Sequence, residues 1–210
     1  MPNWCDNVLV IENLVQGEIQ ELEQAARSEN FCEFIAPSPD WNNTPNEDGE
    51  LPVVDQRFQG VSWWSDGEQD LRWLDWNNEN WGSKWGDCEG SVESSKEAGT
   101  LTYDFQTAWS PLNENFLRAL SLKYPQSLIT LKHLESGNDF IGATIARNGR
   151  VIDECLDFSS LEEGWFEASH NGEVMDEDER EERWCDEMDD FGWEFLGGLS
   201  ARLEQQLSAV

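Results

Sequence analysis

The fold class of this chain is decided by the stretch Thr100-Leu101-Thr102-Tyr103-Asp104-Phe105-Gln106-Thr107. Apolar and polar side chains alternate along it, which predicts a β-strand with one face in the core and one face toward water. Apolar residues then recur at helical spacing over residues 112–124, and Pro125 ends this helix. Ser110-Pro111 in front of it would supply the N-cap and a proline at the first helical position.

Further strands are expected on both sides of this unit. Downstream, alternating patterns predict strands at residues 127–135, 140–147 and 151–158, and Asn148-Gly149 between the last two is a strong hairpin signal. Upstream, the sequence predicts a short buried strand at residues 5–12, a helix at 18–28 and a strand within 84–94.

The order β-α-insertion-β-β-α-β predicts an α+β protein with a ferredoxin-like antiparallel sheet and helices on one face. We assign residues 1–158 to this domain, with a Trp-rich insertion at about residues 36–84. Residues 159–210 are expected to form an acidic helical extension packed on or beside the domain.

The net charge of −31 is unusual, since 44 acidic residues oppose 13 basic ones, whereas small domains typically carry a magnitude of roughly 2–8. Residues 101–150 have a net charge of +1, and residues 151–210 have 19 acids against three arginines. Such a field excludes direct binding to nucleic acid or to an anionic membrane. The natural inference is a basic partner protein or many bound cations.

The acidic extension contains an amphipathic helix at residues 177–191, where Trp184, Met188 and Phe191 form one apolar stripe. After Gly192 a second helical pattern begins, and the two helices are expected to form a hairpin docked on the sheet. A charged helix face is often only a solvated face. The acids with which we expect a partner to interact are Asp176, Glu177, Asp178, Glu181, Glu182, Asp186, Glu187, Asp189 and Asp190.

Three patches of sequence resemble the YubB-like proteins of phages and conjugative plasmids. They are the N-terminal run Met1-Pro2-Asn3-Trp4-Cys5-Asp6-Asn7-Val8-Leu9, the segment from Trp76 to Trp85 with Asn80-Trp81-Gly82-Ser83-Lys84, and Phe105-Gln106-Thr107-Ala108-Trp109-Ser110-Pro111. The resemblance covers about residues 1–150. It implies a ferredoxin-like domain carried on mobile genetic elements, and no catalytic residues can be carried over from it.

Motifs of catalysis and of metal binding are missing from the sequence. Its two histidines, His133 and His170, belong to no metal-ligand pattern, and we expect His133 to be a structural histidine with its hydrogen bonds satisfied. The five cysteines are widely spaced and odd in number, which indicates reduced, mostly buried thiols. We therefore expect a non-enzymatic protein without cofactor or metal. It has neither a transmembrane run nor a signal peptide, so a cytoplasmic location in the host cell is expected.

The leading functional hypothesis is nucleic-acid mimicry. A helix that presents carboxylates along about 20 Å approaches the charge density of DNA, about one charge per 1.7 Å of axis. Such a surface can occupy the basic channel of a nucleic-acid-binding protein. Together with the resemblance to mobile-element proteins, it suggests an anti-defence inhibitor of a host restriction or CRISPR enzyme. The high charge also favours a monomer or, through the apolar stripe, a weak dimer.

Two other interpretations remain open. In the first, the chain is a protein-interaction module that recognises its partner by shape. The contact surface would be the insertion, where Trp63, Trp64, Trp73 and Trp76 are the candidate contacts, or an exposed sheet edge. Those tryptophans would alternatively form a small core for the insertion. In the second, the acidity reflects a saline host, which fits the four lysines against nine arginines. The near-neutral residues 101–150 fit it less well.

Overall fold

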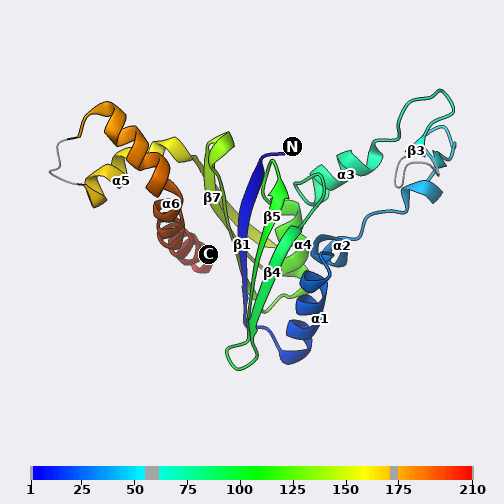
Figure 1. The fold of residues 1–210 in the computed structure, drawn as a ribbon. Coiled ribbons are helices and arrows are strands. Elements are labelled where there is room, and N and C mark those ends of the chain that lie inside the picture. The colour runs from blue at the N-terminus through cyan, green and yellow to red at the C-terminus, as the bar shows by residue number, and fades with distance from the viewer. Residues whose placement is uncertain (1, 55–61, 171–174, 210) are drawn as a thin grey trace.

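The computed structural model describes residues 2–54, 62–170 and 175–209. A six-stranded antiparallel sheet with the order β4-β5-β1-β6-β7-β8 forms its centre (Figure 1). The predicted strands are confirmed, with ends that differ by a few residues. They are β1 (Trp4–Glu12), β4 (Cys88–Ser95), β5 (Thr100–Ala108), β6 (Leu128–Glu135), β7 (Phe140–Arg147) and β8 (Arg150–Asp157).

The sequence β1-α1-β4-β5-α4-β6 and its spatial order β4-β5-β1-β6 are those of a ferredoxin-like sandwich. The hairpin β7-β8 extends the sheet beyond β6, and Asn148 (φ 47°) and Gly149 (φ 79°) form its left-handed turn. The α+β, ferredoxin-like fold is therefore confirmed. The helices are α1 (Gln16–Arg27), α2 (Phe31–Ile35), α3 (Arg72–Asn80), α4 (Glu114–Lys123), α5 (Glu162–Ser169) and α6 (Glu177–Ser208).

One face of the sheet is packed by α1, α2 and α4 (Figure 1). Leu9 lies opposite Tyr103 on one side and Leu131 on the other, and all three side chains have no exposed surface. Ile19 of α1 and Phe116 of α4 complete this core on the side of the helices. The alternation in β5 thus places its apolar residues in the core, as its sequence predicts.

The opposite face is covered only in part, by α6 and α5. Leu196, Leu199 and Leu203 of α6 pack on Ile141 and Ile145 of β7, which forms a second core. In Figure 1 this helix runs along the side of the sheet opposite to α1 and α4, and its contacts are with β6, β7 and β8. The second face of β4, β5 and β1 is consequently open.

The predicted helical hairpin after residue 177 is wrong, because α6 is one continuous helix of 32 residues. Gly192 does not end it. A Cβ atom at this position would lie 2.8 Å from Leu134 Cδ1 and 2.9 Å from Phe158 Cε2. The glycine therefore allows the helix to approach the sheet closely, and the element that pairs with α6 is the short helix α5.

The predicted N-cap of α4 is also displaced. Asn113, and not Ser110, caps the helix, since its side-chain oxygen accepts the backbone N–H of Phe116 at 3.0 Å. Ser110 instead donates its hydroxyl to the carbonyl oxygen of Gly82 at 2.5 Å. This bond ties the loop before α4 to the end of the insertion, and Pro111 lies in that loop.

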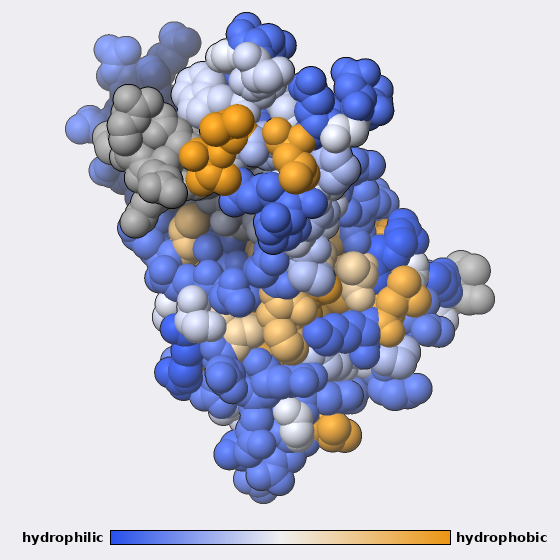
Figure 2. Space-filling model, turned by 90° about the vertical axis from the view of Figure 1, so that its right-hand side faces the viewer, coloured by the Kyte–Doolittle hydropathy of each residue, from blue (hydrophilic) through white to orange (hydrophobic). Residues whose placement is uncertain are grey.

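The insertion contains the 3₁₀ turn η1 (Trp41–Asn43), the two-stranded ribbon β2 (Val53–Val54) and β3 (Ser62–Trp63), and helix α3. The adjoining stretch at residues 55–61 lies outside the described residues. On the side of the molecule seen in Figure 2, apolar residues form separate patches on a mainly hydrophilic surface. No helix of the described ranges is long and apolar enough to cross a bilayer.

Candidate functional site

The first half of α6 carries the nine acids selected from the sequence. Asp176 is the N-cap, and its carboxylate accepts the backbone N–H of Glu179 at 2.9 Å. Both arginines of this segment have partners outside the nine, because Arg180 pairs with Glu162 at 2.8 Å and Arg183 with Glu179 at 3.4 Å. The exposed members of the nine are Asp176, Glu177, Asp178, Glu181, Glu182, Asp186, Asp189 and Asp190.

Glu187 differs from the other eight because it holds α5 against α6. Its carboxylate accepts a hydrogen bond from Trp165 Nε1 at 3.1 Å and approaches His170 Nε2 at 3.2 Å. These hydrogen bonds hold the pKa of Glu187 below its usual range. We therefore assign Glu187 to the packing of the extension, and the remaining eight acids to the exposed surface, called the acidic ridge below.

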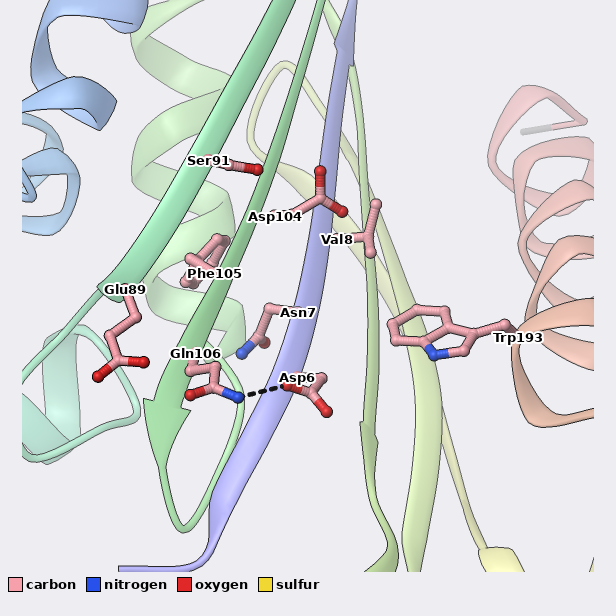
Figure 3. Close-up of a pocket in the computed structure, with 9 residues that line it drawn as sticks. All are labelled: Asp6, Asn7, Val8, Glu89, Ser91, Asp104, Phe105, Gln106 and Trp193. Atoms are coloured by element: carbon pink, nitrogen blue, oxygen red, sulfur yellow. Dashed lines mark hydrogen bonds between the residues drawn. The ribbon is translucent and has the colours of Figure 1, made fainter. Parts of the chain in front are cut away.

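A groove lies between α6 and the open half of the sheet (Figure 3). Its volume is about 540 Å³, and Trp193 of α6 forms one wall. The strands contribute Asp6, Glu89 and Asp104, and Gln106 donates its amide to Asp6 at 2.8 Å. β1, β4 and β5 contain no lysine or arginine, so this floor is acidic. Lys132 of the neighbouring strand lies opposite Val8 at its border.

The groove and the acidic ridge are electrostatically continuous. The pKa of Asp189 on α6 is raised by partial burial and by the charges of Asp6 and Asp190. Partial burial and the nearby charge of Glu93 also raise the pKa of Asp104. Carboxylates of β1 and α6 thus repel each other, as do those of β4 and β5, and a cationic partner would relieve both repulsions.

The acids of the sheet are not among the site residues predicted from the sequence. Asp104 belongs to a strand whose alternation places it on the polar face, so its local signal is present, whereas Asp6 belongs to a segment predicted as a buried strand. What the local signal lacks is the pairing of β1 with β5, which brings residues about a hundred positions apart onto one surface.

The four tryptophans proposed as an alternative contact surface are spread through the insertion, and the structure does not bring them together. Trp64 lies over the guanidinium of Arg72 at 4.6 Å, and Trp76 packs edge-on against buried Trp81 at 5.5 Å. Trp63 and Trp73 are also half-buried. This packing gives the insertion aromatic contacts in place of a large aliphatic core.

A different tryptophan cluster reaches the surface, namely Trp4, Trp85 and Trp109. Trp85 and Trp109 are each 44% exposed, and their rings lie 5.6 Å apart. Trp4 lies 6.2 Å from Trp85, and Lys84 Nζ lies 5.0 Å from the centre of the Trp85 ring. One tryptophan comes from each of the three patches that carry the resemblance.

His133 is buried as expected, but the expectation that its hydrogen bonds are satisfied is wrong. Neither ring nitrogen has a hydrogen-bond partner within the part of the chain that the structure describes. Burial lowers the pKa of His133 to about 4, so the imidazole is neutral at pH 7. It lines a cavity of about 400 Å³ together with Thr144 and Asp153, whose side chains bond to each other at 2.6 Å.

The described residues contain no group of three or more His, Cys, Asp or Glu side chains that could hold a metal ion. The five cysteines are free, and only Cys5 and Cys32 are buried, fewer than the sequence suggested.

Comparison with known proteins supports the fold. A family model described as the ferredoxin-like domain in Api92-like protein matches residues 80–191, more than half of the chain. The chain belongs to this family. The match extends from β4 into α6 and so includes the acidic ridge.

A crystal structure of the protein api92 from Yersinia pseudotuberculosis is similar at 12% sequence identity, with a TM-score of 0.44. The similarity covers 75% of this chain and 98% of that one. No curated protein matches the chain.

Proposed function

We propose that the chain is a non-catalytic inhibitor that mimics nucleic acid. Its target would be a basic, nucleic-acid-binding defence enzyme of the host cytoplasm, of the restriction or CRISPR type. We also infer from the three sequence patches that the chain is YubB-like and comes from a phage or plasmid. The observation that carries the proposal is the continuous acidic face formed by the acidic ridge and the groove beside it.

The geometry of this face suits a nucleic-acid channel. The ridge residues 176–190 span about 21 Å of helix, and the carboxylates of the groove widen the charged surface beyond a single helix. A helix anchored by Trp165, Trp184 and Leu196 presents these charges on a rigid support. The inhibitor could bind a channel lined by lysine and arginine without the free-energy cost of ordering its own residues on binding.

The test is inhibition of DNA cleavage by a panel of restriction endonucleases and RNA-guided nucleases. We expect the chain to inhibit at least one of them. Neutralising the eight ridge acids to Asn or Gln should weaken that inhibition by about a hundredfold or more, since each desolvated charge contact is worth about 1–3 kcal/mol. Glu187 stays unchanged in this variant because it supports the fold.

A matched control separates this local effect from the total charge. It neutralises eight exposed acids elsewhere and so has the same net charge as the ridge variant. Equal losses in the two variants would show that only the overall field matters, and no inhibition by the unmodified chain would contradict the proposal. The control residues are Glu47, Asp48, Glu50, Asp66, Glu68, Asp75, Glu79 and Glu97.

Recognition of a partner by shape remains a second candidate, and the surface cluster Trp4–Trp85–Trp109 favours it. Exposed tryptophans are enriched among residues that dominate protein–protein binding. Substitution of Trp85 and Trp109 by Ala would abolish target binding under this reading and would leave it nearly unchanged under mimicry.

A further inference from the structure

The outer edge of the sheet is open at β8. In the β7-β8 hairpin, Arg147 lies opposite Arg150 across a two-residue turn, so Arg150 and every second residue after it bond to β7. The backbone groups of Val151, Asp153 and Cys155 therefore point away from the sheet. Within the described ranges no further strand and no turn forms hydrogen bonds with these outward-pointing backbone groups. An unpaired edge of this kind is a template for a further strand.

An apolar groove runs directly beside this edge, between β8 and α6. Its volume is about 510 Å³. Leu156 of β8 forms one side, and Phe191, Phe195 and Leu199 of α6 form the other. Gly198 also lines it, where a Cβ atom would meet nothing within 4 Å. A strand added to β8 would direct every second side chain into this groove.

The charges around the edge indicate which strand fits. Asp153 and Asp157 point to the face opposite the groove, where a partner's remaining side chains would lie. At the groove itself, Glu154 pairs with Arg202 at 2.6 Å, and Glu194 is exposed. Together with Arg150, β8 and the lining of the groove therefore contain four carboxylates and two guanidinium groups. A second copy of this chain would place acidic edges of two strongly negative molecules together, which is unfavourable.

We propose that the β8 edge binds an extended segment of a partner protein in which apolar residues alternate with lysine or arginine. The segment adds a seventh strand to the sheet by backbone hydrogen bonds to Val151, Asp153 and Cys155. Its apolar side chains enter the groove over Leu156 and Phe195, and its basic side chains lie near Asp153 and Asp157. This inference does not rest on nucleic-acid mimicry, because the edge and its groove are distinct from the acidic ridge.

The test uses a fluorescently labelled octapeptide of alternating valine and lysine, with fluorescence anisotropy as the readout. The control peptide has the same composition with four valines followed by four lysines, so it has the same charge without the alternation. We expect the alternating peptide to bind about tenfold or more tightly than the control. Equal binding of the two peptides would show attraction by charge alone and would overturn the proposal.

Two glycine variants localise the binding. Gly198→Phe fills the groove, whereas Gly197→Phe adds the same side chain at a neighbouring helix position that does not line it, and neither added Cβ meets an atom within 4 Å. The first should weaken peptide binding by about tenfold or more, and the second by less than about threefold. Equal effects would contradict the assignment.

Amide hydrogen exchange supplies a readout of the backbone bonds. On addition of the alternating peptide, the amides of Val151, Asp153 and Cys155 should exchange more slowly, because strand addition protects them. Unchanged exchange with bound peptide would contradict strand addition. A dimer of the unliganded chain in sedimentation that is lost in Gly198→Phe would assign the edge to a second copy, and would also overturn the proposal.

Discussion

The two faces of the sheet differ in the polarity and the burial of their side chains. Under α1 and α4, Leu9, Tyr103 and Leu131 form an unbroken apolar row with no exposed surface. On the reverse side of the same strands, Asp6 and Asp104 face a groove that α6 leaves open. The alternation of β-strands allows a sequence to assign stability to one face and interaction to the other. Substitutions on the packed face should therefore change stability more than substitutions on the open face.

The largest difference is expected between Leu131→Ala and Val8→Ala. Leu131 is fully buried, so its truncation should lower the free energy of unfolding by about 2–5 kcal/mol. Val8 lines the open groove and should cost about 1 kcal/mol or less. Urea denaturation of both variants measures the two values, and similar losses would mean that the second face is packed as well.

His133 lies on the packed face and should make stability dependent on pH. In the unfolded chain His133 binds a proton below about pH 6.5. In the folded chain its pKa is about 4, so it stays neutral until the pH falls to that value. Stability should fall as the pH decreases through this window, by about 3 kcal/mol. The His133→Gln variant should lack this part of the decrease. Parallel pH profiles for the two proteins would show that His133 is not buried as a neutral ring.

The contact between α6 and the covered part of the second face depends on Gly192. Gly192→Ala should destabilise the protein by about 1–3 kcal/mol, because the methyl group meets Leu134 and Phe158. Gly197→Ala, in the same helix but with free space around it, should stabilise it by up to about 1 kcal/mol through helix propensity. In thermal unfolding, the Tm should fall for Gly192→Ala and rise for Gly197→Ala. Two stabilising substitutions would imply that α6 does not dock closely.

The smallest effect is expected in the open groove. Partial burial and Glu93 raise the pKa of Asp104, so its charge is unfavourable at neutral pH and less so as the pH falls. Asp104→Asn should therefore stabilise the protein by a few tenths of a kcal/mol at pH 7, and the gain should vanish in acid. Loss of stability in this variant would indicate that Asp104 has a structural partner.

The fold could be predicted because its signals are local. The alternation in β5 and the Asn148-Gly149 turn each specify an element through neighbouring residues. The sequence predicts a helix end at Gly192 because glycine ends many helices, whereas its role depends on the distance to Leu134, which only the packed structure defines.

The candidate site was predicted in part. The acids of α6 stand out in the sequence, whereas the electrostatic effect of Asp6 on Asp189 follows from tertiary structure alone. Which tryptophans are exposed could likewise not be predicted from the sequence. Composition reveals a Trp-rich segment, but exposure separates Trp85 and Trp109 from buried Trp81.

We propose that the acidic ridge and its groove bind a basic partner in place of nucleic acid. The most direct test of this proposal is the affinity of the chain for an inhibited nuclease between 50 and 200 mM salt, with and without duplex DNA. Mimicry predicts a loss of about a thousandfold over this range, and displacement by the duplex. An affinity that stays constant with salt and tolerates bound DNA would contradict the account.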